Sequence, residues 1–253
     1  MLRRFRADLH IHTTLSPCAS DELTPPAILA AAEFCGIDVI GAVDHNATGN
    51  GWALVEAAAR PSAAPIRVLP GLEIESAEGV HVVCLSDQPD EAEAMQHFVW
   101  ARLPAGENRP EILGEQWLMN AVGDPIGREQ RLLAQATSLS LGDICRESRR
   151  RGLLTLPAHV TRRSHGLFGV LGFMPEGLEI DGLELGPTCA SLTGRAQQDL
   201  SRGPLVASSD AHQLEQIGES YTDFWLSEPT VAELRLALQQ RDGRRAVIVR
   251  REL

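Results

Sequence analysis

Side chains that commonly bind metals cluster in five short stretches of this 253-residue sequence, each ending or following an apolar run. Six of the eight histidines lie in these stretches, close to aspartate or glutamate. Imidazole and carboxylate together suit zinc, manganese and iron, and three such ions packed together would need about this many ligands. A single buried histidine is usually only hydrogen-bonded, but six in one pattern indicate a metal-dependent hydrolase. The stretches are DLHIH (Asp8, His10, His12), VDHN (Asp44, His45), GLEIES with VHVVCL (Glu73, Glu75, His81), PAHV (His159) and SSDAH (Asp210, His212).

The elements that must position these side chains alternate between strands and helices. Residues 24–36 predict a helix, with Thr24 as its N-cap, Pro25 at the first helical position and Gly36 as its terminator. The apolar, β-branched run that follows predicts a buried strand ending at Asp44. The same rhythm predicts strands in 66–76, 80–85, 153–159, 178–185, 204–212 and 244–250, and helices in 140–152 and 230–243.

This alternation predicts one α/β domain over residues 1–253. Polar residues at the carboxyl ends of parallel barrel strands meet at one mouth, so the five stretches are expected to converge. Residues 86–139 interrupt the rhythm and predict a helix, a loop rich in proline and glycine, and a hairpin. Such an insertion either covers a functional site or only elaborates the packing.

Composition and net charge limit which binding partners and which cellular compartment we expect for this protein. The 23 basic residues, all arginine, against 34 acidic ones give a net charge of −11. We therefore expect no extended duplex nucleic acid as a partner, although a local arginine pocket could hold one phosphate group. Five scattered cysteines and no apolar run long enough for a bilayer predict a cytoplasmic protein without membrane contact. The pattern does not indicate an oligomeric state.

The ordered motifs, an HxH pair, a DH pair, a glutamate-bearing strand, PAH and SDAH, resemble the polymerase and histidinol phosphatase (PHP) family over residues 7 to about 215. The resemblance implies a distorted (β/α)7 barrel, similar to a TIM barrel, with two or three divalent metal ions at the strand ends. It implies one metal on His10, His12 and Asp210, a second on His45 and His212, and a third on His81 and His159, with Glu73 as a bridge.

The family usually supplies one more ligand shortly after the HxH pair. Asp21 is predicted to be that ligand, with Cys18 as the alternative, and a thiolate there would favour zinc over manganese.

Other side chains are predicted to support this centre. Asp8 and Asp44 are expected to orient imidazoles through hydrogen bonds, or else to cap nearby backbone amides. Arg162, Arg163 and His165 follow a ligand-bearing strand and are candidates to hold a substrate phosphate, although the arginines could be ordinary loop charges.

The predicted function is hydrolysis of a phosphate ester by a hydroxide that bridges the metals, with Glu73, Asp210 and His212 at the reacting centre. The expected substrate is a small phosphorylated metabolite, a nucleotide or the end of a short oligonucleotide. Either His212 or His165 could protonate the leaving oxygen. Two alternatives stay open: a metallohydrolase of the same fold that cleaves a C–N bond, and a non-catalytic regulatory module stabilised by its metals.

Overall fold

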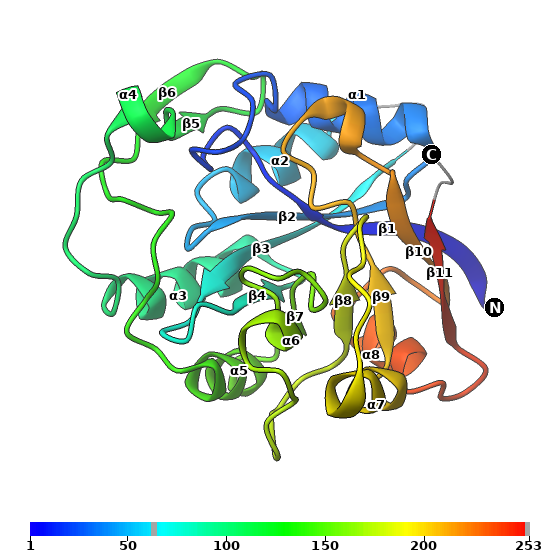
Figure 1. Ribbon diagram of the computed structural model, residues 1–253. Coiled ribbons are helices and arrows are strands. Elements are labelled where there is room, and N and C mark those ends of the chain that lie inside the picture. The colour runs from blue at the N-terminus through cyan, green and yellow to red at the C-terminus, as the bar shows by residue number, and fades with distance from the viewer. Residues whose placement is uncertain (62–64, 251–253) are drawn as a thin grey trace.

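The computed structural model describes residues 1–61 and 65–250. Its centre is a curled seven-stranded sheet with helices around the outside (Figure 1). The strand order is β11-β10-β1-β2-β3-β4-β7. These strands are β1 (Arg3–Ile11), β2 (Val39–His45), β3 (Arg67–Glu75), β4 (His81–Leu85), β7 (Leu154–Pro157), β10 (Ser220–Leu226) and β11 (Arg245–Arg250).

The remaining elements form two small sheets and the surrounding helices. Strand β5 (Trp117–Met119) pairs with β6 (Pro125–Arg128), and β8 (Leu183–Leu185) pairs with β9 (Leu205–Ala207). The helices are α1 (Pro25–Cys35), α2 (Gly51–Ala58), α3 (Pro89–Trp100), α4 (Pro110–Leu113), α5 (Leu141–Arg150), α6 (Leu167–Val170), α7 (Gly194–Arg202), α8 (Val231–Leu238) and the 3-10 turn η1 (Leu214–Gln216). No helix in the described part of the chain has the length and apolar character needed to span a membrane.

Local sequence signals explain where the helices begin and end. Helix α1 starts at Pro25 and ends at Gly36, whose φ of 66° is the left-handed conformation that glycine adopts easily. In α5, the Ser140 side chain accepts a hydrogen bond from the Asp143 backbone amide, as its capping spacing predicts. Helix α8 follows the same pattern, with Thr230 accepting from the amide of Glu233, but it ends at Leu238, earlier than predicted.

The main sheet is mixed, which differs from the parallel sheet that the sequence pattern suggested. Strands β1, β2 and β3 are parallel, whereas β4 runs antiparallel to both β3 and β7. The link from Glu75 to His81 is too short for a helical crossover, so β3 and β4 form a hairpin. Strand β10 is likewise antiparallel to β1 and β11.

Both faces of the central strands are buried, as their continuous apolar sequences predict. In β2, Val39 and Val43 pack in one hydrophobic cluster together with side chains of α8. Ile40 packs in another cluster, against α1 and α2. The segment 86–139 begins with α3, which packs into the core beside β3 and β4 rather than standing apart as a cap. Helix α4 and the β5–β6 hairpin follow it at the edge of the barrel (Figure 1).

Candidate metal centre

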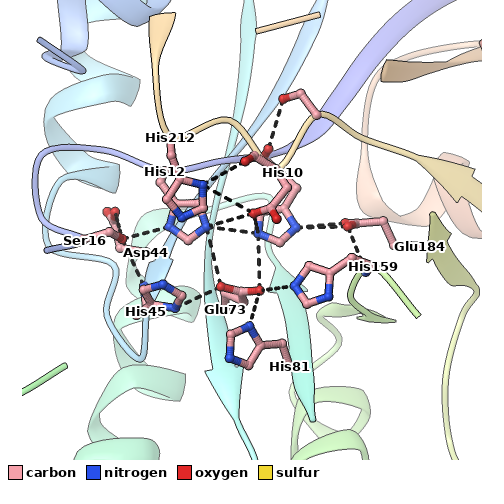
Figure 2. A network of polar contacts seen from close by, with 12 residues as sticks. His10, His12, Ser16, Asp44, His45, Glu73, His81, His159, Glu184 and His212 are labelled. Carbon is pink, nitrogen blue, oxygen red and sulfur yellow. Dashed lines mark hydrogen bonds and ion pairs between the residues drawn. The ribbon is translucent and has the colours of Figure 1, made fainter. Parts of the chain in front are cut away.

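The sheet brings the five motif stretches to one mouth of the barrel. His10 lies on β1, His45 ends β2, and His45 is paired in register with Glu73 on β3. His81 begins β4, yet it lies at the same mouth because β4 runs antiparallel to β3. The loop after β9 reaches the centre because Ala211 bridges to β1. Figure 2 shows the resulting ring of imidazoles around Glu73.

Glu73 is the hub of this centre and is almost completely buried, with 1% of its side chain exposed. Five imidazoles face its two oxygens, which is the arrangement expected of a carboxylate that bridges cations. The Oε1 atom lies 2.7 Å from His81 Nδ1, 3.1 Å from His159 Nε2 and 3.5 Å from His10 Nε2, and the Oε2 atom lies 2.9 Å from His45 Nδ1 and 3.5 Å from His12 Nε2.

Four residues form the most enclosed group of potential ligands: His10, His12, Glu73 and Asp210. The Oδ1 atom of Asp210 lies 3.3 Å from His10 Nε2 and 3.4 Å from His12 Nε2, and those two nitrogens are 3.2 Å apart. This is the set predicted for the first metal together with its bridge. The converging imidazole and carboxylate atoms suit a divalent transition metal.

The orientation of His12 is set by a chain of hydrogen bonds. Ser16 donates its hydroxyl hydrogen to Asp44 Oδ1 at 2.6 Å, so Ser16 Oγ must accept from His12 Nδ1 at 2.8 Å. Thr13 adds donors to Asp44 from its amide and its hydroxyl. Asp44 therefore orients an imidazole as predicted, but it does so through Ser16. The Nε2 atom of His12 therefore carries a lone pair, which points into the centre.

A buried carboxylate that the sequence reasoning missed orients His10. Both oxygens of Glu184, on β8, lie 3.1 Å from His10 Nδ1, and Glu184 Oε1 also accepts from the His159 backbone amide. His10 thus presents Nε2 to the centre, as metal-binding histidines held by a carboxylate do. The available signal was a glutamate alternating with leucines in the strand LEL.

Charge around the two imidazoles indicates that a cation belongs between them. Burial opposes a charged His10, but the carboxylates of Glu184, Asp210 and Glu73 together raise the pKa of His10 well above its ordinary value. Burial, and then the neighbouring His212, lower the pKa of His12 well below its ordinary value. Three carboxylates therefore surround the two imidazoles with negative charge, which a divalent cation between them would offset.

A second group of potential ligands contains His12, His45 and His212. The Nδ1 atom of His212 donates to the Asp210 backbone carbonyl at 2.8 Å, which leaves Nε2 free to bind. Cys18 lies at this group, with Sγ 3.2 Å from His45 Nε2. Burial disfavours its thiolate, but His212 and His45 outweigh that effect and lower the pKa of Cys18 to about 6.

Asp21 is not brought to the centre. It is exposed on the loop before α1 and belongs to none of the ligand groups found among the described residues. Cys18 also belongs to none of these groups, but its Sγ atom lies 3.2 Å from His45 Nε2, so it is the nearer of the two candidates to the centre.

The third predicted site is more buried than the second, since the side chains of His81 and His159 are 8% and 4% exposed, against 13% and 26% for His45 and His212. His81 forms a group with His45 and Glu73, and His159 contacts Glu73 from the other side. His81 also belongs to a group with Glu75 and His165 nearer the solvent. The rings of His81 and His165 stack with centroids 4.4 Å apart.

Asp8 acts differently from the prediction that it orients an imidazole. Its carboxylate accepts hydrogen bonds from the backbone amides of Ser209 and Gly218, both at 2.9 Å. Burial raises the pKa of Asp8 to about 6. Its role is to fix the loop that carries Asp210 and His212, which is the alternative that the sequence left open.

Backbone conformation at the centre is unusual. Asn46, His159, His165 and Asp210 all have positive φ values, between 31° and 61°. Non-glycine residues rarely adopt this region, and it costs free energy that the surrounding structure must offset. Four such residues within or beside the predicted ligands indicate that the loops are shaped for a site.

The centre opens into a cavity of about 530 Å³. Arg162 lies in its wall, half-exposed, with Nη1 3.3 Å from Asp210 Oδ2, and His165 lies beside it. Arg163 is exposed and is not among the residues that line the cavity. Ala134 completes the wall, so part of the segment 86–139 does reach the site.

Comparisons with known proteins found similar sequences. A family model described as PHP-associated matches residues 202–242. The uncharacterized protein YqxK of Bacillus subtilis (strain 168) is 31% identical over 101 residues, which are 38% of this chain and 26% of that protein. The chain therefore spans about a quarter of the length of this curated relative.

Solved structures resemble the whole chain. The lesion-specific endonuclease Q of Pyrococcus furiosus has a TM-score of 0.72 and 18% identity, over 99% of this chain and 60% of that one. A two-domain protein of Bacteroides vulgatus containing a predicted PHP-like metal-dependent phosphoesterase has a TM-score of 0.58 and 16% identity, over 100% of this chain and 66% of that one.

These similarities confirm the predicted resemblance and the PHP-type distorted barrel fold. The two structures described above are a lesion-specific endonuclease and a protein containing a predicted metal-dependent phosphoesterase, which agrees with the hydrolase class predicted for this chain.

The expectation that extended duplex nucleic acid is excluded as a partner is wrong. A structure of endonuclease Q, with a TM-score of 0.70 and 18% identity over 96% of this chain and 58% of that one, holds a 27-mer duplex with an abasic lesion at its active site. Net charge is a sum over the whole molecule and does not describe the field at one mouth. An overall charge of −11 therefore gives no ground for excluding duplex DNA.

Proposed function

We propose that this protein is a metal-dependent phosphoesterase. The observation that carries the proposal is the hub at Glu73, where five imidazoles converge on one buried carboxylate at the floor of an open cavity. A purely structural metal site is closed and needs one ion, whereas this centre has shared ligands and is open to solvent on one side.

The donor set fits divalent cations. Three buried atoms, Glu73 Oε2, Asp210 Oδ1 and His159 Nδ1, have no hydrogen-bond partner among the described residues, and unsatisfied buried polar atoms are costly. When bound, the cations would supply Lewis-acid chemistry, lowering the pKa of water and neutralising phosphoryl oxygens. The residues that would hold two or three such ions, zinc, manganese or iron, are His10, His12, Cys18, His45, Glu73, His81, His159, Asp210 and His212.

Residues of the cavity wall would bind the substrate. The Arg162 guanidinium is half-exposed beside Asp210, so it can turn to a substrate phosphate and donate two parallel hydrogen bonds. His165 stacks on the ring of His81 in the cavity wall and would contact the leaving group. His212 is less suited to protonating a leaving group, because Nδ1 donates to the backbone and Nε2 faces the metal position.

The substrate is proposed to be a phosphate ester of a small metabolite, a nucleotide or an oligonucleotide. The cavity is large enough for a mononucleotide, since small-ligand sites usually occupy about 300–1,000 Å³. An internal phosphate would require room at the mouth of the cavity for nucleotides on both sides of the reacting phosphorus, whereas a terminal phosphate would require room on one side only.

The test is hydrolysis by the full chain, stripped of metal and reloaded with manganese or zinc. Substrates would be a phosphate monoester, a phosphate diester, a nucleotide and a duplex oligonucleotide with an abasic site. Glu73→Gln should abolish turnover, because it removes the bridging charge while preserving the side-chain volume. Glu78→Gln is the matched control, since Glu78 is exposed on the same hairpin and does not line the cavity.

Two outcomes would reject the proposal. One is full turnover by Glu73→Gln. The other is tight binding of two or more metals with no hydrolysis of any of the four esters.

A further inference from the structure

The β5–β6 hairpin is attached to the loop that follows the HxH pair. The Trp117 amide, on β5, donates to the Thr14 carbonyl at 2.8 Å. The side chain of Asn50, fully buried just before α2, accepts from the Met119 amide at 2.9 Å and donates to the Trp117 carbonyl at 3.0 Å. The edge of β5 that does not pair with β6 is therefore held by Asn50 and Thr14.

Asn50 also begins a chain of hydrogen bonds that ends at a predicted metal ligand. Its Nδ2 atom lies 2.9 Å from Thr13 Oγ1, and the Thr13 hydroxyl donates to Asp44 Oδ2 at 2.7 Å, so Thr13 Oγ1 accepts from Asn50. The other oxygen of Asp44 accepts from Ser16, which accepts in turn from His12. Both halves of the chain donate toward Asp44, so reversing any one bond would leave a partner unsatisfied.

Burial makes this chain a rigid connection. None of its members is more than 2% exposed, so water cannot replace a lost partner. A hydrogen bond in such surroundings is stronger than in water, and an unpaired polar group is costly. The position of the hairpin is therefore coupled to the orientation of the His12 ring.

A second buried asparagine attaches the end of the segment 86–139 to the next ligands. Asn46 directly follows His45 and has a positive φ of 52°. Its Nδ2 atom donates to the carbonyls of Leu133 and Gln135, both at 2.8 Å, while its Oδ1 atom accepts from the Glu75 amide at 3.3 Å. The same segment is thus tied to the loop after β1 and to the ends of β2 and β3, which all carry predicted ligands.

We propose that Asn50 is a positioning residue of the metal centre, which couples the β5–β6 hairpin to His12. The segment 86–139 would then support the ligands from outside, a role distinct from covering the site or only extending the packing. The inference rests on the proposed function, because it requires that His12 binds a metal ion.

Zinc affinity of the full chain, measured by competition with a chelator, tests the coupling. Thr13→Val nearly keeps the side-chain volume but removes the hydroxyl between Asn50 and Asp44. It should weaken zinc binding by about 10-fold, the lower end of the range for outer hydrogen-bond partners of metal ligands. Asn50→Asp keeps the acceptor for the Met119 amide but loses the donor to Thr13, and it should give a similar loss.

Thr14→Val is the matched control. Thr14 is buried in the same loop and its Oγ1 atom lies 3.2 Å from Asn50 Nδ2, but it has no hydrogen bond to Asp44 among the described residues. This variant should lose stability yet keep the zinc affinity of the unaltered chain. The double variant Thr13→Val with Asn50→Asp should bind zinc no more weakly than the weaker single variant, because both changes cut one chain, whereas independent effects would add.

Cobalt(II) gives a second readout that a general loss of stability would not move. Its visible absorption bands depend on the arrangement of the ligands around the ion. The spectrum of the cobalt-loaded chain should change in Thr13→Val and in Asn50→Asp, and it should stay the same in Thr14→Val.

The outcomes separate this inference from the proposed function. Unchanged zinc affinity and an unchanged cobalt spectrum in both Thr13→Val and Asn50→Asp would overturn the role of Asn50 and leave the phosphoesterase proposal intact. An equal loss of zinc affinity in Thr14→Val would also overturn it, because packing of the loop would then explain the effect. An unaltered chain that binds no divalent metal would overturn both.

Discussion

Glu184 offers the sharpest test of how the centre is positioned, because it touches a predicted ligand but is not one itself. Its side chain is fully buried, and both oxygens lie 3.1 Å from His10 Nδ1. Replacing it with glutamine keeps the volume and one acceptor but removes the charge that holds His10. A buried amide NH₂ group then faces a ring nitrogen that is already a donor.

The expected loss of metal affinity can be estimated from the contact between Glu184 and His10. Removing a hydrogen-bond partner behind a metal ligand usually weakens metal binding by about 10- to 100-fold. This corresponds to about 1.4 to 2.8 kcal/mol, since each tenfold change in affinity is about 1.4 kcal/mol. The full effect should fall on the metal of His10, with a smaller effect on the metal of His45 and His212.

The assay is a competition titration of zinc against a chelator, with Glu184→Gln compared to the unaltered chain. Glu179→Gln is the control, because Glu179 is exposed in the segment that leads into the same strand. If Glu184→Gln binds both metals as tightly as the unaltered chain, Glu184 does not position His10 for metal binding, and the reasoning from the buried pair is wrong.

Three further predictions concern the framework of the site. Ser16→Ala should destabilise the fold by about 1–3 kcal/mol, because it leaves the buried Nδ1 hydrogen of His12 without its acceptor and removes one of the two donors to Asp44 Oδ1; urea unfolding would measure this, and unchanged stability would contradict the assigned chain of hydrogen bonds. Glu233→Gln should cost about 1 kcal/mol at neutral pH, because the hydrogen bond from Arg244 lowers the pKa of Glu233 to about 2. Since a depressed pKa contributes stability only while the group is charged, the stability difference from the unaltered chain should vanish as pH falls from 4.5 toward 2, and a constant difference would refute the assignment. Gly41→Ala should prevent folding or strongly lower the melting temperature, because the added Cβ would lie 2.2 Å from a backbone oxygen of β1; normal melting would show that the two strands can separate without cost.

The sequence predicted which side chains converge at the centre better than it predicted the groups that orient them. Histidine and carboxylate at the ends of apolar runs are visible without a structure, and every imidazole predicted as a ligand reaches the centre. Glu184 could not be recognised, because a glutamate in a short apolar strand does not reveal which imidazole it faces. Ser16 was hidden for a similar reason, since its partner Asp44 lies on another strand.

The path of the loops explains why the structure differs from the sequence prediction at Asp21 and Asp8. The choice between Asp21 and Cys18 depends on where the chain turns after the HxH pair, and that turn is set by Ser16. Similarly, the position of Asp8 beside the HxH pair suggested an imidazole partner. In the structure its carboxylate instead accepts hydrogen bonds from two backbone amides of the adjacent loop. Residue type and spacing thus identify candidates, and the path of the backbone decides among them.

The bridge between Ala211 and β1 has a consequence for how the protein is made. Backbone hydrogen bonds from the His12 amide to the Ala211 carbonyl, and from the Ala211 amide to the His10 carbonyl, join the earliest motif to the latest. A ribosome has therefore translated five of the six motif histidines before the residues that complete the first site exist. Until Asp210 and His212 have emerged, the nascent chain displays an imidazole cluster with an open side, so the predicted first and second metal sites cannot be complete before residue 212 has been synthesised.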